Sequence, residues 1–299
     1  MVVFVTMKDT PEISIIVSIY NSAELANEAL ESIAQYGGDV SWDCIVIDDA
    51  STDGGLVLID EKYKQDPRFL FVQNEKNVGY SALNIAMDCM HGKYLMTLDT
   101  DAKLWPGTLR ALVNFMDTHP EAGAATGNLH YPDGRIQNYY RRHMTPLVAF
   151  YTTVPGRFID KYFLGLRHYN SYHYTDLDTT RVFEIEMAVV ACLILRREAL
   201  GSRITDPAFR MFIDVDLCRK IYDRGYKIYL VPNAKATHIK TVSFGKMNIK
   251  KFDQQYYDGL QLYLKKYFPA STPLMPLIFW VDRVLRDLLK RTVGRAPMR

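Results

Sequence analysis

The chain has 299 residues, of which 48% are hydrophobic and 23% are charged, and its formal net charge is +2. This length is sufficient for the full core of one large α/β domain, with or without appendages. Because the charge is nearly balanced and no basic stripe is present, nucleic acid is not an expected partner.

Cysteines and apolar runs indicate the compartment. The four cysteines lie far apart and form no CxxC pair, which is typical of reduced core thiols in the cytosol. The apolar run at residues 2–5 is too short for a signal peptide, and no stretch approaches the ~20 apolar residues of a spanning helix. The sequence therefore predicts a cytoplasmic protein that is either soluble or attached to a membrane surface.

The first 130 residues alternate between strand-like and helix-like hydrophobic patterns. Residues 13–19 form a continuous β-rich run, which is typical of a strand buried on both faces of a parallel sheet. Apolar residues at helical spacing follow through Tyr36, and the helix ends at Gly37-Gly38. The alternation continues as strand 44–47, helix 57–63, strand 69–72, helix 80–90, strand 94–98 and helix 108–116. Four repeats predict a doubly wound, mainly parallel sheet flanked by helices.

Polar residues follow each of these strands, at the sheet edge where ligands bind in such folds. The polar segments are Tyr20-Asn21, Asp48 to Gly54, Asn74 to Gly79 and Asp99-Thr-Asp101. Turn formation and helix capping explain Ser51 and Gly54. They do not explain two aspartate pairs in one crevice, where like charges repel unless a cation or hydrogen bonds compensate.

Four segments resemble, in order and spacing, the family 2 glycosyltransferases of GT-A fold. They are Ile15-Ile-Val-Ser-Ile-Tyr-Asn21, Val46 to Gly54, Asn74 to Asn84 and Leu98 to Gly107. The second half is similar to the rhamnosyltransferase-like branch of that family, at Ala191 to Leu200, Met211 to Cys218 and Gly225 to His238. The resemblance covers residues 12–268. It implies a GT-A domain, a Rossmann-like nucleotide-diphospho-sugar transferase fold, over 1–268, with a nucleotide-sugar-binding half at 12–130 and an acceptor-side half at 131–268.

Asp99 and Asp101 match the family's DxD motif. A leaving nucleoside diphosphate develops negative charge, which a divalent cation held by carboxylates stabilises, and oxygen ligands suit Mn²⁺ or Mg²⁺. Branch relatives often carry Asn-Pro-Asp here, so the resemblance implies Asp101 as the main ligand and Asp99 as the second. It also implies His238 as a third ligand. The alternatives are a plain turn before Pro106 and a structural histidine.

Asp214 matches the aspartate of the family's Glu-Asp motif, and the resemblance implies that it is the catalytic base. An inverting transfer needs such a base on the acceptor hydroxyl, opposite the leaving group. Ile213 replaces the usual preceding glutamate, so the orientation of Asp214 departs from the pattern. Val190 stands where the branch usually has glycine, so the acceptor-side geometry departs from it as well. Asp216 is the alternative base; without that role it is a first-turn aspartate favoured by the helix dipole.

Donor recognition falls to residues at the strand ends. The candidates are Ser18, Tyr20, Asp48, Asp49, Asp53, Asn77, Gly79, Asn84 and Asp99. The imide N–H of a pyrimidine needs an acceptor, which an aspartate after the second strand supplies. Gly79 allows the backbone to approach the ligand closely. Asn77 and Asn84 are open to a second interpretation, as a loop turn and a polar contact inside a helix.

Two further regions interrupt or follow the alternation. Residues 131–183 lack a clear period and are rich in tyrosine and arginine, which predicts a lid-like insertion that binds sugar or an anionic group, or else a locally packed loop. Residues 269–299 predict an amphipathic basic helix and tail, on an anionic membrane, on the protein's own core or on a homodimer partner. The apolar stripe is Leu277, Trp280, Val281, Val284, Leu285 and Leu288, and the polar face is Asp282, Arg283, Arg286, Asp287, Lys290 and Arg291, with Arg295 and Arg299 in the tail.

The resemblance implies an inverting, metal-dependent glycosyltransferase in cell-surface polysaccharide synthesis. Its donor would be dTDP-rhamnose or a UDP-sugar, its acceptor a glycan or polyprenyl-linked saccharide, and its place the inner face of the cell membrane. The rival functions are a hexosyl or galactofuranosyl transferase on another acceptor and a catalytically inactive glycan-binding homologue. A nucleotidyltransferase is disfavoured because no Gly-rich phosphate loop with a basic residue follows the first strand.

Overall fold

The computed structural model describes residues 10–165, 167–175, 177–239 and 249–293. Within them, one nine-stranded mixed sheet forms the centre of the molecule, with the strand order β3-β2-β1-β4-β8-β6-β9-β5 and with β7 paired to β9. Its strands are β1 (Ile13–Ile19), β2 (Trp42–Asp48), β3 (Phe69–Gln73), β4 (Tyr94–Leu98), β5 (Ala102–Leu104), β6 (Ala122–His130), β7 (Phe183–Ile185), β8 (Cys192–Arg196) and β9 (Lys227–His238). The first four strands are mutually parallel, whereas β8 runs antiparallel to both β4 and β6. The α/β sheet flanked by helices that the sequence predicts is confirmed, and antiparallel pairings of β5, β7 and β8 make it a mixed sheet.

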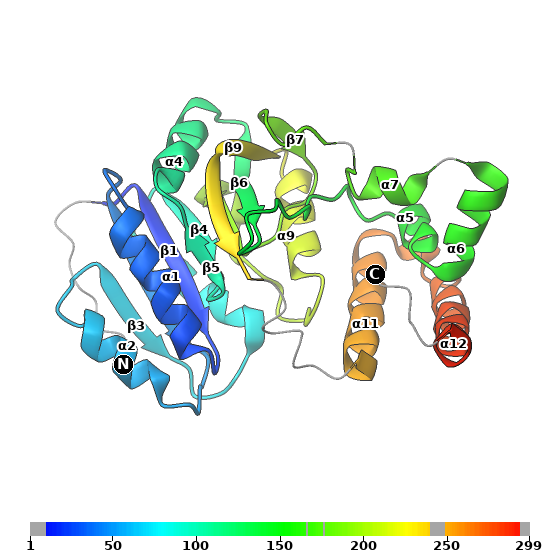
Figure 1. Ribbon diagram of the computed structural model, residues 1–299, viewed down its shortest axis with the longest axis horizontal. Coiled ribbons are helices and arrows are strands. Elements are labelled where there is room, and N and C mark those ends of the chain that lie inside the picture. Colours follow the sequence, from blue (N-terminus) through cyan, green and yellow to red (C-terminus); the bar gives the residue numbers. More distant parts are fainter. Residues whose placement is uncertain (1–9, 166, 176, 240–248, 294–299) are drawn as a thin grey trace.

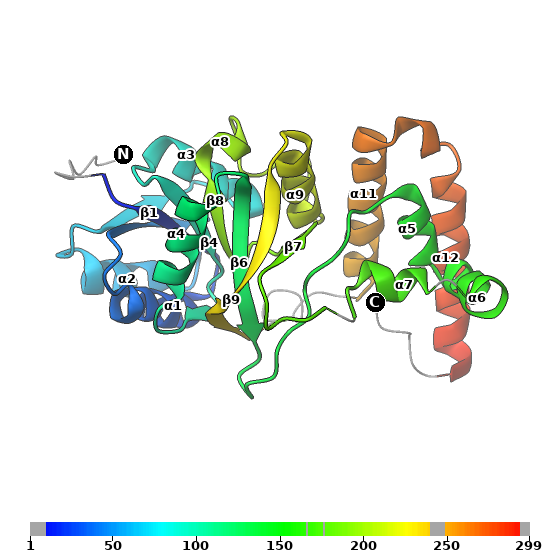
Figure 2. The same ribbon diagram turned by 90° about the horizontal axis from the view of Figure 1, so that it is seen from above.

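Helices cover both faces of this sheet (Figures 1 and 2). They are α1 (Ala23–Tyr36), α2 (Gly55–Tyr63), η1 (Gly79–Ile85), α3 (Ala86–Cys89), α4 (Thr108–Thr118), α8 (Arg197–Leu200) and α9 (Ile213–Asp223). The apolar sides of α1 and α4 share one buried cluster with β1, and α3, α8 and α9 contribute to the cluster on the other face. Every residue of β2 is buried, as expected for a strand covered on both faces.

The helix predicted at 80–90 is a 3₁₀ turn, η1, followed by the short helix α3. Gly79 begins it with φ +62°, a backbone conformation that glycine adopts without strain. The carboxylate of Asp49 accepts hydrogen bonds from the backbone amides of Val78 and Gly79. These hydrogen bonds hold the start of η1 against the end of β2, so the chain forms a tight turn at Gly79.

A second group of helices lies beside the sheet (Figures 1 and 2). We call this group the helical subdomain. It consists of α5 (Pro146–Tyr151), α6 (Val154–Ile159), the π-helical turn η2 (Asp160–Leu164), α7 (His168–Tyr172), α11 (Ile249–Tyr267), the 3₁₀ turn η3 (Pro269–Ser271) and α12 (Met275–Val293). The region expected as a lid-like insertion thus supplies helices that pack against α12, and the two segments treated separately in the sequence form one unit.

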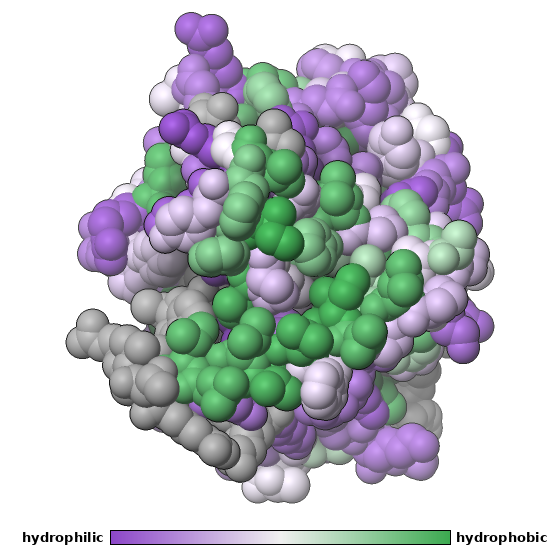
Figure 3. Space-filling view, turned by 90° about the vertical axis from the view of Figure 1, so that its right-hand side faces the viewer, coloured by the Kyte–Doolittle hydropathy of each residue, from purple (hydrophilic) through white to green (hydrophobic). Residues whose placement is uncertain are grey.

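The C-terminal helix α12 is present, but its exposed side is the opposite of the one expected for an amphipathic helix on a protein core. Its charged residues Asp282 and Arg286 are buried, whereas Leu277, Trp280 and Leu288 are exposed. Most of the predicted stripe therefore does not dock on the protein's own core: Val281 and Leu285 are half-buried, and the helix packs on the core through Phe279 instead. Arg286 does not face outward. The exposed apolar side chains lie on the outer face of the helical subdomain (Figure 3). Arg295 and Arg299 lie outside the described residues, as do the side chains of Lys290 and Arg291. No described helix is long and apolar enough to cross a membrane.

Candidate active site

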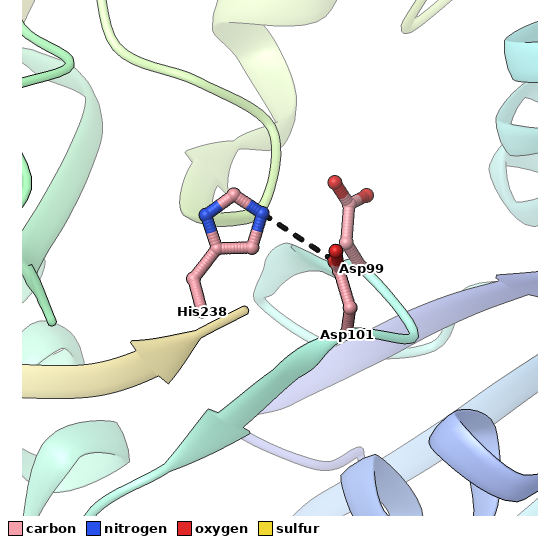
Figure 4. A group of neighbouring side chains, drawn as sticks. All are labelled: Asp99, Asp101 and His238. Atoms are coloured by element: carbon pink, nitrogen blue, oxygen red, sulfur yellow. Dashed lines mark ion pairs between the residues drawn. The ribbon is translucent and has the colours of Figure 1, made fainter. Parts of the chain in front are cut away.

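Asp99, Asp101 and His238 form one cluster beyond the end of β4 (Figure 4). One ligand atom from each residue lies within 4.8 Å of the others, and Nε2 of His238 is 3.4 Å from Oδ1 of Asp101. We call this group the carboxylate–imidazole cluster. The three residues predicted as metal ligands are thus brought together.

Strand pairing brings the histidine to the aspartates. The short strand β5 begins directly after Asp101 and pairs antiparallel with the end of β9, so that Ala102 faces His238. The backbone amide of Ile239 donates to the carbonyl of Asp101 at 2.9 Å, and that of Asp99 donates to the carbonyl of Ala191 at 3.0 Å. Backbone bonds to two other segments therefore hold both ends of the DxD turn.

Gln137 sets the tautomer of His238. Its side-chain amide donates to the backbone carbonyl of His238, and its side-chain oxygen lies 3.0 Å from Nδ1 of the ring. Because that oxygen can only accept, we assign the ring proton to Nδ1. The lone pair of Nε2 then points at Asp101, which is the arrangement that a metal-ligating histidine adopts with a partner on its second nitrogen.

The electrostatics of the cluster fit a cation. Burial raises the pKa of Asp99 to about 7, and the neighbouring carboxylates of Asp101 and Asp214 raise it further than His238 lowers it. Of the residues that the structure describes, no lysine or arginine forms an ion pair with any of these three carboxylates. Two carboxylates and one imidazole nitrogen are a suitable donor set for Mn²⁺ or Mg²⁺, which would relieve this repulsion.

Asp214 lies at the start of α9 and faces the same region. Its Oδ1 accepts a hydrogen bond of 2.9 Å from the backbone amide of Val190. Burial raises the pKa of Asp214 to about 6, although that hydrogen bond and His238 act in the opposite direction. Ile213, at the position of the usual glutamate, is buried in the core. The backbone of Val190 therefore orients Asp214 without a neighbouring acid.

Asp216 lies on a different side of α9. Its Oδ1 accepts from Nζ of Lys266 at 2.7 Å and from the hydroxyl of Tyr267 at 2.8 Å, and the residue is buried. Two positions along an α-helix differ by about 200° in direction, so Asp214 and Asp216 do not share a face. Asp216 fastens α9 to α11, which favours Asp214 for chemistry in the crevice.

The two aspartates that end β2 are engaged with the protein itself. Asp48 is fully buried; its Oδ1 accepts from the amide of Ser51 and its Oδ2 from Nε2 of Gln73. Asp49 accepts from the side chain of Asn74 as well as from the two amides at the entry to η1. Both carboxylates therefore shape the loops around the crevice, and only their remaining lone pairs are left for a ligand.

The other predicted donor residues divide into engaged and accessible ones. Asn84 accepts hydrogen bonds from the amides of Ile204 and Thr205 and donates one to the carbonyl of Thr205. These bonds match its second interpretation in the sequence, as a polar contact within the protein. Asn77 is exposed and donates to the carbonyl of Asp49 at 3.4 Å. Tyr20 and Asp53 are exposed, and Ser18 is half-buried near the end of β1.

Three residues near the site were missed by sequence reasoning. The carboxylate of Asp99 is the largest cause of a pKa for Tyr80 well above the usual value, with burial and Asp214 next, so Tyr80 lies beside these carboxylates. Gln137 has no local signal in the sequence, because its partner His238 is about a hundred residues away, at the end of β9. Arg210 stands beside Gly79, where an added Cβ would lie 3.3 Å from its Nη1. Of these three residues, only Tyr80 has a sequence signal that could have identified it, namely its position directly after Gly79.

The fold and the cluster at its strand ends define a GT-A nucleotide-sugar transferase fold, and solved structures agree. A mannosyltransferase from Pyrobaculum calidifontis, solved with GDP-Man and Mn²⁺, superimposes with a TM-score of 0.57 at 18% identity, over 95% of this chain and 76% of that one. TarS from S. aureus, solved with UDP-GlcNAc, gives the same TM-score and identity over 95% of this chain and 73% of that one.

The chain belongs to glycosyl transferase family 2, whose family model matches residues 14–202. An uncharacterized glycosyltransferase of Haemophilus influenzae is 32% identical over 37% of this chain and 34% of its own length. The putative teichuronic acid biosynthesis glycosyltransferase TuaG of Bacillus subtilis is 30% identical over 39% of this chain and 46% of its own. The chain thus matches less than half the length of these curated relatives.

Proposed function

We propose that this chain is an inverting, metal-dependent glycosyltransferase that uses a nucleoside-diphosphate sugar. The observation that carries the proposal is the carboxylate–imidazole cluster, with Asp214 close enough to affect the pKa of Asp99. A divalent cation bound there would neutralise the charge that develops on the leaving diphosphate. Asp101 and Nε2 of His238 would hold it together with Asp99, and Gln137 would orient the histidine.

In this proposal, Asp214 acts as the base. The acceptor hydroxyl oxygen forms a bond to the anomeric carbon as the bond from that carbon to the diphosphate oxygen breaks, and the hydroxyl proton passes to the carboxylate of Asp214. Attack opposite the leaving group inverts the anomeric configuration. The hydrogen bond from Val190 holds one oxygen of Asp214 in place and leaves the other for the proton.

We further propose a dTDP- or UDP-sugar as donor, with dTDP-rhamnose first, and a glycan or polyprenyl-linked acceptor. The residues after β1, β2 and β3 would bind the nucleotide, in a donor half at 12–130. Family relatives support a role in cell-surface glycan synthesis: TuaG is named for teichuronic acid and an Escherichia coli relative, WcaA, for colanic acid. Such an acceptor would place the enzyme at the inner face of the membrane.

The experiment that tests the function is release of free nucleotide from a panel of nucleotide sugars. We expect release with Mn²⁺ and its loss with a chelator, and we expect the true donor to raise the melting temperature because it binds only the native state. The inactive glycan-binding homologue predicts no release from any donor under either condition. Stereochemistry at the anomeric carbon of the product then tests inversion.

A further inference from the structure

The outer face of the helical subdomain carries large apolar side chains from two segments that lie far apart in the sequence (Figure 3). On α12 they are Leu277, Trp280, Val284 and Leu288, and on α6 and η2 they are Phe158, Tyr162, Phe163 and Leu164. The exposed fractions reach 62% at Trp280 and 74% at Phe163. Because α12 contacts α6, the two sets form one surface, which we call the apolar platform.

A buried polar network around Asp282 holds α12 in the orientation that exposes the platform. Asp282 is 1% exposed; its Oδ1 accepts from the amide of Val154 at 2.6 Å, and its Oδ2 accepts from Tyr257 and, at 2.9 Å, from Nε of Arg286. Val154 is the first residue of α6, so the carboxylate also caps that helix at its positive end. Rotating α12 to hide its apolar stripe would expose this network and leave the α6 amide unpaired, so the stripe stays outside.

The charges of the two segments indicate what covers the platform. Residues 154–167 contain three basic residues and one acidic residue, and residues 275–299 contain six basic and two acidic residues. The side chains of these segments that the structure describes carry a formal charge of +2, with Lys161 and Arg167 exposed, and the sequence adds four basic residues at 290–299. A second copy of the chain would bring the same positive segments against each other. An anionic lipid surface complements both the charge and the apolar side chains.

We infer that the apolar platform docks on an anionic lipid bilayer, with α12 and α6 lying in the plane of the interface. Trp280 and Tyr162 are amphipathic aromatic residues of the kind enriched at such boundaries. Lys161 and Arg167 are exposed on the same segment and meet the headgroups. The inference deepens the membrane-side function proposed above, and it replaces the headgroup role predicted for Arg286, which is 6% exposed and paired.

The test measures binding of the full chain to vesicles, without any sugar donor. Vesicles of phosphatidylcholine with phosphatidylglycerol are compared with phosphatidylcholine alone, by co-sedimentation and by tryptophan emission. We expect binding to the anionic vesicles, weaker at high salt through screening. We also expect a blue shift of emission, because Trp280 is exposed whereas Trp42 is buried and Trp105 is half-buried.

Matched variants separate the platform from general stickiness. Phe163→Glu and Trp280→Glu should each weaken vesicle binding about ten-fold or more, because each removes a large buried apolar side chain from the interface. Val57→Glu is the control, since Val57 is 61% exposed on α2, away from the platform. All three positions are exposed, so circular dichroism melting should be unchanged.

Three results would overturn the inference. The first is that the wild-type protein stays in solution with anionic vesicles, and the second is that Val57→Glu weakens vesicle binding as much as the platform variants do. The third is a dimer in sedimentation velocity that Trp280→Glu dissociates while vesicles bind nothing, because a second copy would then cover the platform. Nucleotide release without lipid should persist in every variant, so failure of the catalytic proposal would appear there and not in vesicle binding.

Discussion

Buried carboxylates have opposite environments in the two parts of the molecule. In the crevice at the ends of the strands, Asp99 is surrounded by Asp101 and Asp214, and no described lysine or arginine forms an ion pair with it. In the helical subdomain, Asp282 is fully buried, whereas Asp99 is half-buried, and Arg286, Tyr257 and a helix N-terminus satisfy Asp282. Both carboxylates are largely removed from solvent, so what distinguishes a site for chemistry from a structural contact is the missing positive partner.

The largest effect should come from removing a carboxylate of the crevice. Asp101→Ala should abolish sugar transfer and weaken Mn²⁺-dependent donor binding, because the diphosphate loses the cation that neutralises it. Nucleotide release and Mn²⁺ titration measure the two effects. Asp66→Ala is the control and should behave as wild type, because Asp66 is half-buried in the loop before β3 and pairs with the local Arg68. Normal turnover of the Asp101 variant would remove this residue from the metal site.

The second prediction compares two acids on one helix. Asp214→Asn keeps the shape but cannot take a proton, so turnover should fall ~100-fold or more while donor affinity holds. Asp216→Asn should instead lower stability, because the buried side chain at this position would lose its ion pair with Lys266, which keeps Asp206 as a partner. Steady-state kinetics and thermal melting distinguish the two. If Asp216→Asn is the inactive, stable variant, the assignment of the base is wrong.

The third prediction breaks the paired carboxylate. Asp282→Ala should lower the free energy of unfolding by about 3 kcal/mol, because it leaves the buried guanidinium of Arg286 without its partner. Denaturant unfolding measures the change. Glu61→Ala, at an exposed position of α2, is the control and should leave the free energy of unfolding unchanged. At low temperature, where both variants stay folded, each should still release nucleotide. Loss of that activity in Asp282→Ala would show that the catalytic crevice depends on the helical subdomain.

The smallest effect concerns pH. The pKa of Asp214 is raised to about 6 by burial, and a base must be deprotonated to act. Below that pH, kcat/KM should therefore fall ~10-fold per pH unit, and it should level off above it. A bound cation would move this acidic limb of the pH–rate profile to lower pH, since positive charge favours the ionised carboxylate. The residual activity of Asp214→Asn should lack the limb; an unchanged limb would assign it to another group.

The amino-acid pattern predicts the crevice better than the helical subdomain, for a physical reason. Strands 13–19 and 94–98 match β1 and β4 because a buried strand reads as a continuous apolar run, and the polar residues that follow it must lie at the sheet edge. The exposed side of α12 could not be predicted, because helical spacing shows two faces but not which one the protein covers. The deciding contact joins Asp282 to Val154, and no local pattern reports a partner that distant.

The pairing of β5 with β9 has a consequence for how the protein is made. Asp99 and Asp101 leave the ribosome early, but His238 ends the last strand of the sheet, and β9 lies between β6 and β5. A nascent chain therefore holds two repelling carboxylates until β9 has emerged. Because such non-local pairing closes late in folding, we expect the ability to capture a cation to mark completion of the sheet, and chains truncated before β9 to lack it.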